Sequence, residues 1–130
     1  MEFPTDEATT VSTLRKAISR FVQERGWERF HNPKNLAESI CIEASELLEL
    51  FQWLTTAESK NLNKDPANIH LISSELADVL IYCFALANAV QVDVSSSVLS
   101  KLKESSRRYP ASSYMGKAPS RCRSISRKIY

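Results

Sequence analysis

The chain has 130 residues, two glycines and a formal net charge of +2, which together predict one all-α globular domain. The polar opening residues MEFPTDEATT predict that no secretory signal peptide is present, and the apolar run at residues 79–90 is shorter than the ~20 residues of a membrane span. An odd number of cysteines (Cys41, Cys83 and Cys122) is typical of reduced thiols and predicts a cytoplasmic or nuclear protein.

The first helix is predicted from about Thr9 or Thr10 to Arg25, after a disordered segment at residues 1–8. Gly26 then ends it. The next segment, residues 27–35, holds two aromatic residues, a histidine and a proline, and so either lines a ligand pocket or packs as a hydrophobic plug. The predicted apolar stripe of the helix consists of Val11, Leu14, Ile18, Phe21 and Val22.

The second helix is predicted over residues 36–54, and its end lies near residues 53–56. Glu43 falls within the apolar stripe of this helix, and Glu46 lies at the edge of the stripe. Because an unpaired buried carboxylate is costly, Glu43 requires a cation or a proton. The stripe consists of Leu36, Ile40, Leu47, Phe51 and Leu54.

After a polar connection at residues 58–65, Asp65 is predicted to cap a third helix that has Pro66 in its first turn and continues to about Gln91. Residues 79–90 are apolar on all sides except for Asn88, which predicts a helix that is buried on most sides. A helix this apolar needs more cover than three short helices provide, so we expect an oligomer.

A fourth helix is predicted from Val94 to about Arg108, with Asp93 as its cap. The following segment, residues 111–130, is rich in Ser, Pro and basic residues and is predicted to be disordered. Residues 101–130 hold nine Lys or Arg and one acidic residue, whereas residues 1–100 carry a net charge of −6. A solvated basic terminus explains this better than a specific nucleic-acid site.

Two acidic pairs, each spaced i,i+3, stand out: Glu43 with Glu46, and Glu75 with Asp78. One such pair is ordinarily a solvated helix face. If the two helices pack antiparallel, however, all four carboxylates can converge on one point. Hard oxygen ligands with no His or Cys in register favour Mg²⁺ or Mn²⁺ over zinc or copper.

The chain resembles a known family over about residues 14–110: the MazG-like all-α nucleoside triphosphate pyrophosphohydrolases, and within it the dCTP pyrophosphatases. The resemblance rests on the segments ERGWERFHNPKNLA (24–37), EASELLELFQW (43–53), ELADVLIY (75–82) and VLSKLKESSRRYP (98–110). It implies one domain at residues 9–110, an antiparallel four-helix bundle, and a homodimer or homotetramer. It further implies Mg²⁺-dependent cleavage of dCTP, or of modified dCTP, to dCMP and pyrophosphate in nucleotide-pool sanitation.

The resemblance also implies site residues, and the chemistry of the side chains agrees with the assignments. Mg²⁺ is expected on the four acidic residues, with Glu46 as the one that orients the attacking water. Ser105 stands where the family has Asn, and its shorter hydroxyl cannot make the same pair of contacts. The base and sugar are expected at Trp27, His31, Trp53 and Tyr82, and the triphosphate at Lys101, Ser105 and Arg108.

Two other functions are compatible with the sequence. The same scaffold could act on another substrate, such as dUTP or phosphoribosyl-ATP, because the stacking of a base on aromatic rings does not specify the base. A helical interaction module with weakened catalysis is the alternative of a different class. Neither a membrane nor a specific nucleic acid is expected as a partner.

Overall fold

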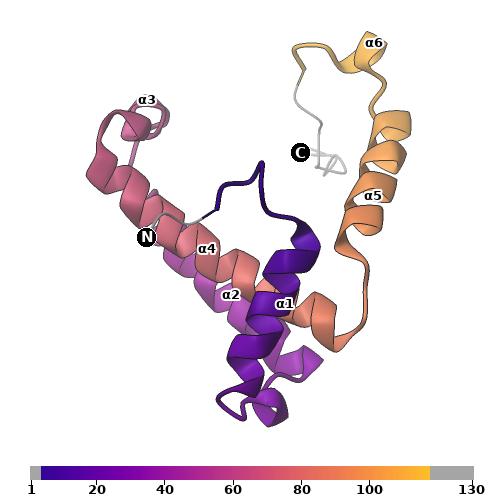
Figure 1. Cartoon of the computed structure of the whole chain (residues 1–130). Coiled ribbons are helices and arrows are strands. Elements are labelled where there is room, and N and C mark those ends of the chain that lie inside the picture. The colour runs from indigo at the N-terminus through magenta and orange to yellow at the C-terminus, as the bar shows by residue number, and fades with distance from the viewer. Residues whose placement is uncertain (1–3, 118–130) are drawn as a thin grey trace, which may run out of the picture. The chain divides into compact units, whose positions relative to one another are not determined.

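The computed structural model describes residues 4–117, and these residues contain helices and no strands, as predicted (Figure 1). They form two compact units, which divide between Val94 and Ser95. The elements are α1 (Val11–Gln23), η1 (Glu28–Phe30), α2 (Pro33–Glu49), α3 (Thr56–Ser59), η2 (Leu62–Lys64), α4 (Pro66–Ala89), α5 (Val94–Arg108) and α6 (Ala111–Tyr114).

Side-chain caps fix where the main helices begin. The Asp65 carboxylate accepts a hydrogen bond from the backbone N–H of Ala67 at 2.9 Å, with Pro66 in the first turn of α4, as predicted. The same signal begins α2, where Asn32 accepts from Asn35 N–H at 3.0 Å ahead of a proline. Helix α2 therefore begins at residue 33, three residues before the predicted start.

The end of α2 also differs from the prediction, because the helix stops at Glu49 instead of near residues 53–56. Residues 51–53 form a turn, and the chain then begins the short helix α3 with a capping box. In this box the Thr55 N–H and hydroxyl donate to the Glu58 carboxylate at 2.8 and 2.7 Å. The chain therefore starts a new helix instead of continuing α2, and the predicted polar connection at residues 58–65 contains the end of α3 and all of η2.

Glycine ends α1 and directs the chain that follows. Gly26 has φ +60°, a conformation that favours glycine, and the Trp27 N–H donates to the Val22 carbonyl at 3.1 Å. This reversal brings the Trp27 ring edge-on to Phe21, with centroids 5.8 Å apart. The guanidinium of Arg25 lies 3.6 Å from the centre of the Phe21 ring.

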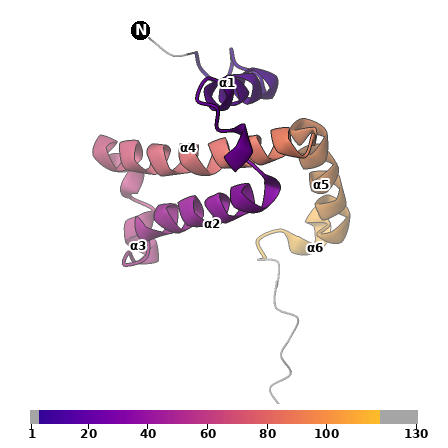
Figure 2. The ribbon, with the colours of Figure 1, turned by 90° about the horizontal axis from the view of Figure 1, so that it is seen from below.

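Helices α2 and α4 run antiparallel and side by side, and α1 lies against α4 (Figure 2). The buried side chains are few: Leu36 on α2, which is 2% exposed, Val22 on α1, and Ala85 and Ala87 on α4. Burial of residues 79–90 on most sides was wrong for the single chain, because Leu80 and Val90 are each 45% exposed.

Helix α4, with 24 residues, is by length and composition alone long and apolar enough to cross a membrane. The prediction considered only the run at residues 79–90, whereas the helix continues back to Pro66. The core helix of a soluble protein passes the same test. Two acidic residues, Glu75 and Asp78, lie midway along this helix, and they favour the soluble interpretation.

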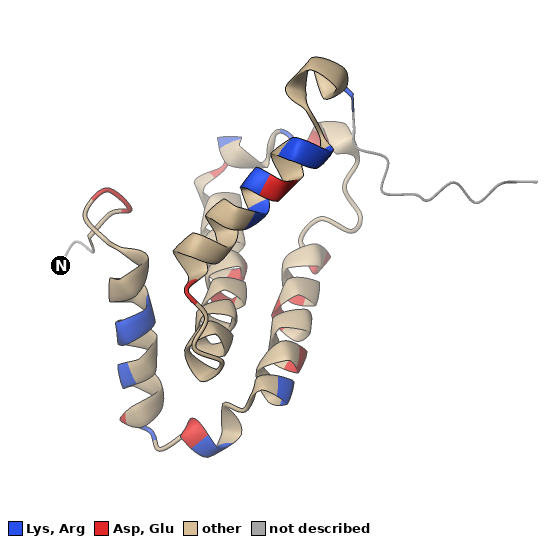
Figure 3. Ribbon diagram, turned by 90° about the vertical axis from the view of Figure 1, so that its right-hand side faces the viewer, with Lys and Arg blue, Asp and Glu red and all other residues tan. Residues whose placement is uncertain are grey.

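In the second unit, α5 spans Val94–Arg108, the predicted bounds. Its acidic residue Glu104 pairs with Lys101 at 2.8 Å and with Arg108 at 2.9 Å, and the hydrogen bond from Lys101 lowers the pKa of Glu104. Figure 3 shows this acidic position between the basic ones of the helix. Within the segment that was predicted to be disordered, residues 111–114 form α6. Residues 118–130, Cys122 among them, lie outside the described part of the chain.

A polar contact joins α1 to α4 and explains the single polar residue of the apolar run. The Asn88 side chain accepts from Arg15 Nε at 2.8 Å and donates to the Arg15 carbonyl at 3.0 Å. The same guanidinium donates to the Ala87 carbonyl at 3.2 Å. These hydrogen bonds are partly buried, and each gives a partner to a polar group that would otherwise be buried without one.

Replacing Asn88 with Leu is expected to destabilise the fold by about 1–3 kcal/mol, since the Arg15 groups lose their partners. Urea unfolding followed by circular dichroism measures the change. In a double-mutant cycle with Arg15→Met, the double variant should lose less than the sum of the two single variants. Additive losses would contradict a direct interaction between the two residues.

Candidate active site

Three carboxylates from two helices meet where α2 faces α4. Glu43 of α2 and Glu75 and Asp78 of α4 each place a carboxylate oxygen within 4.8 Å of the others, and all three side chains are half-buried. The antiparallel pairing of the helices places Glu43 opposite the i,i+3 pair of α4. Hence the mid-stripe position of Glu43 is explained by a polar centre and not by the apolar core.

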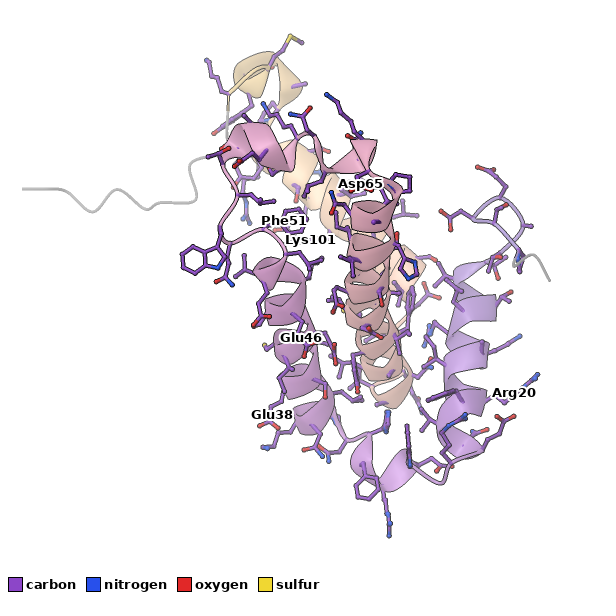
Figure 4. The ribbon with its side chains drawn as sticks, turned by 90° about the vertical axis from the view of Figure 1, so that its left-hand side faces the viewer. Arg20, Glu38, Glu46, Phe51, Asp65 and Lys101 are labelled. Carbon is purple, nitrogen blue, oxygen red and sulfur yellow. The ribbon has the colours of Figure 1, made fainter. Side chains whose placement is uncertain are left out.

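The fourth predicted ligand, Glu46, lies outside this group of three and is exposed. Figure 4 shows it on α2, between Glu38 and Phe51 along the helix. It remains close enough for its charge to act on Glu43. Three of the four predicted carboxylates therefore converge, and the fourth stands beside them.

The negative charges of these carboxylates repel one another, and after burial this repulsion has the largest effect on the pKa of Glu43. Burial raises the pKa of Glu43, and the charges of Glu46, Asp78 and Glu75 raise it further. A proton or a cation relieves this repulsion. Three hard oxygen donors with no nitrogen or sulfur donor among them fit Mg²⁺ or Mn²⁺ better than a softer metal.

A cavity of about 460 Å³ adjoins the cluster and shares Asp78 with it. It brings together three of the four residues predicted to bind the base and sugar, namely Trp27, His31 and Tyr82. Trp53 does not line it, because α2 ends at Glu49 and leaves Trp53 in a turn, 87% exposed. Trp27 and His31 of the segment at residues 27–35 line this cavity, and Trp27 also packs against Phe21, so both the pocket and the hydrophobic-plug interpretation of the segment stay predictions.

The other wall of the cavity was not predicted. Apolar residues of α1 form much of it, and in the sequence they were indistinguishable from core residues, because a helical stripe does not show which part of it another element covers. The unpredicted lining residues are Ala17, Ile18, Phe21, Val22, Ile81 and Ala85.

His31 is held in one orientation. Its Nδ1 lies 2.9 Å from the Trp27 carbonyl oxygen, and because a carbonyl can only accept, Nδ1 carries the proton. In the neutral ring Nε2 is then an acceptor. Ring orientation and tautomer are both set by the backbone of the residue that supplies the neighbouring indole.

The predicted phosphate-binding residues, Lys101, Ser105 and Arg108, all lie on α5 in the second unit. Lys101 and Arg108 are exposed and share the partner Glu104, and Ser105 is half-buried. A phosphate role for these three residues stays a prediction.

Replacing Glu43 with Gln is expected to raise the melting temperature of the metal-free protein at pH 7 by about 2–4 °C. The raised pKa of Glu43 means that its ionised form is disfavoured in the folded state, so the fold loses stability as the pH rises through that pKa. Toward pH 4, where an unfolded Glu is largely protonated, the difference should vanish. Thermal denaturation across this pH range measures it.

Glu49→Gln is the matched control, an exposed residue of the same helix outside the cluster, and it should leave the melting curve unchanged at both pH values. A Glu43→Gln protein that melts below the wild type at pH 7 would show that the carboxylates do not repel one another.

Comparison with known proteins agrees with this geometry. Residues 38–117 match the MazG-like family. The chain is 43% identical over 102 residues to dCTP pyrophosphatase 1 from Homo sapiens, covering 78% of this chain and 60% of the human protein. It is 39% identical over 109 residues to dCTP pyrophosphatase 1 from Rattus norvegicus, covering 84% of this chain and 64% of the rat protein. The chain thus spans less than two thirds of the length of these curated relatives.

A solved structure of a pyrophosphatase from Archaeoglobus fulgidus has the same fold, with a TM-score of 0.69 and 33% sequence identity over 85% of this chain and 98% of that chain. The matched family segment contains Glu43, Glu75 and Asp78, the three residues that form the carboxylate cluster. By sequence and by fold, this chain belongs to the MazG-like family.

Proposed function

We propose that this protein is a Mg²⁺-dependent nucleoside triphosphate pyrophosphohydrolase that converts dCTP, or a modified dCTP, to dCMP and pyrophosphate. The observation that carries the proposal is the position of Asp78, which belongs both to the carboxylate cluster and to the wall of the aromatic cavity. A nucleotide whose phosphates lie at the carboxylates can therefore place its base in the cavity. The names of the human and rat relatives support dCTP as the substrate.

Glu43, Glu75 and Asp78 would hold Mg²⁺, with Mn²⁺ as an alternative. Bound there, the ion would neutralise charge on the triphosphate and polarise the α-phosphate. Glu46 is the residue we assign to the water: its carboxylate is exposed and lies beside the cluster, so it is available to accept a proton as the water attacks the α phosphorus. The bond to the β-phosphate oxygen breaks, which gives a nucleoside monophosphate and pyrophosphate.

Aromatic and basic side chains would position the rest of the nucleotide. Trp27 and Tyr82 both line the cavity and can stack on the base or sugar, one from the segment after α1 and one from α4. We assign Lys101 and Arg108 to the phosphates as electrostatic clamps, with Ser105 supplying a single hydroxyl where the family has a carboxamide. Trp53 is kept in the proposed base site on the condition that a neighbouring copy of the chain covers its ring, which is 87% exposed.

We further propose that the chain is an antiparallel four-helix bundle and that it assembles as a homodimer or homotetramer. Leu76 and Leu80 of α4 are each 45% exposed although the helix is strongly apolar, and contact with a second copy would remove them from water. A nucleotide-sanitising enzyme of this kind would act in the cytoplasm, with the nucleus as an alternative.

Two alternatives remain for the same scaffold. Hydrolysis of another nucleotide such as dUTP would use the same carboxylates and differ only in the cavity. A helical interaction module without activity is disfavoured by the converging carboxylates, since an inactive protein has no need for a repulsive cluster.

Replacing Asp78 with Asn is expected to lower kcat/KM for dCTP at least 100-fold, because the carboxylate lies at both the metal cluster and the cavity wall. Pyrophosphate release from a panel of dCTP, dUTP, dATP and dGTP at fixed Mg²⁺ measures this and identifies the preferred substrate. Glu49→Gln is the control and should keep wild-type turnover. Hydrolysis of no nucleotide by the wild type would favour the interaction module.

Sedimentation at micromolar concentration is expected to show a dimer or a tetramer, and Leu80→Glu should dissociate it, since a charge on this face opposes burial. Leu80 lines neither the aromatic cavity nor the carboxylate cluster, so the substitution tests assembly separately from the site. A wild-type protein that sediments as a monomer would contradict the assembly proposal.

A further inference from the structure

The hydrogen bonds between Arg15 and the end of α4 lie beside the aromatic cavity. The Arg15 guanidinium donates to the Asn88 side chain at 2.8 Å and to the Ala87 carbonyl at 3.2 Å, and the Asn88 amide donates to the Arg15 carbonyl at 3.0 Å. We call these three bonds the Arg15–Asn88 latch. The last turn of α4 has no basic residue of its own, so Arg15 also supplies the positive charge that favours a helix C-terminus.

The latch adjoins the lining of the aromatic cavity along both helices. On α1 the lining begins at Ala17, two residues after Arg15, and on α4 it ends at Ala85, one turn before Asn88. Neither Arg15 nor Asn88 lines this cavity. The latch is therefore placed to fix the α1 wall of the cavity without forming part of that wall.

The other contacts of α1 hold it weakly. In the described part of the chain, Val22 is the one buried residue of this helix, whereas Leu14 is 42% and Phe21 47% exposed. A helix of 13 residues is also marginal by itself in water. The end of α1 away from the latch continues into the reversal at Gly26, about which the helix can pivot. The position of α1 along α4 therefore depends strongly on the latch.

We propose that Arg15 is a positioning residue for the reaction: through Asn88 it holds α1 in place as a wall of the cavity, and so sets the affinity for the nucleotide. The inference rests on the proposed function, because it requires a nucleotide in this cavity. Helix α4 lies between α2 and α1 (Figure 4), and the carboxylate cluster belongs to α2 and α4 alone. Loss of the latch therefore leaves the carboxylates in place.

Loss of the latch should raise KM and spare kcat. Without it, the position of α1 that completes the cavity is one of several that the helix can take, and the apparent affinity falls by the fraction of molecules in that position. The wall contacts the nucleotide equally in the ground state and the transition state, so kcat does not depend on it. In Arg15→Met, KM for dCTP should rise about tenfold, while kcat stays within about twofold of wild type.

Lys16→Met is the matched control, because Lys16 is the next residue of α1, is exposed and does not line the cavity; its KM should equal that of wild type. In the double variant of Arg15→Met with Asn88→Leu, KM should equal that of the weaker-binding single variant, since both substitutions break the same latch. If Arg15→Met does not fold, Arg15→Lys replaces it. The lysine ammonium lacks the planar fork that reaches both acceptors, and KM should still rise about threefold.

Two kinetic outcomes would overturn the inference. A lower kcat with an unchanged KM would show that Arg15 only stabilises the fold, because a smaller folded fraction reduces the amount of active enzyme and not its affinity. KM increases that multiply in the double variant would show that Arg15 does not act through Asn88.

Amide hydrogen exchange of the ligand-free protein tests the latch without turnover. Amides of α1 should exchange about tenfold faster in Arg15→Met, whereas those of α2 should keep the wild-type rate. Unchanged exchange of α1, or equal acceleration of both helices, would contradict the inference. A wild type that neither hydrolyses nor binds any nucleotide would remove the proposed function and this inference with it, whereas hydrolysis with an unchanged KM in Arg15→Met would remove the inference alone.

Discussion

Repulsion among carboxylates that share the contact between α2 and α4 is the constraint on which the rest of the molecule depends. Placing Glu43, Glu75 and Asp78 within 4.8 Å of one another reduces the stability of the empty fold, as the raised pKa of Glu43 indicates. The antiparallel helix pair must be stable enough to tolerate this cost. Because a bound cation would relieve this repulsion, the cation-free fold favours binding one.

A series of local contacts, one after another along the chain, positions the residues around this centre. Gly26 at φ +60° reverses the chain, the reversal lays Trp27 against Phe21, and the Trp27 carbonyl orients His31. Asn32 then caps α2 and starts the helix that carries Glu43. Each step is a hydrogen bond or ring contact between residues close in the sequence, so the aromatic wall and the carboxylate centre are positioned by the same short segment.

Much of this was predictable from the sequence, for reasons that differ between residues. Glu43 was recognisable because a charge interrupts an apolar stripe, and the Asp65-Pro66 pair because its capping chemistry is local. That Trp53 lies away from the cavity of a single chain could not be predicted, because its position depends on where α2 stops, which the Thr55 capping box decides. The extent to which α4 is buried was also misjudged, because periodicity reports that a face is apolar and not which element, or which copy of the chain, covers it.

The split origin of the cavity walls has an evolutionary consequence. The carboxylates lie at residues 43–78, inside the segment shared with the family, whereas α1, Trp27 and His31 precede residue 38, where the family match begins. The carboxylate cluster and the α1 wall of the cavity are therefore encoded in adjacent but different stretches of the chain. Substitutions confined to residues 11–35 would therefore reshape one wall of the cavity and leave the α4 wall, with Tyr82, and the carboxylate cluster unchanged.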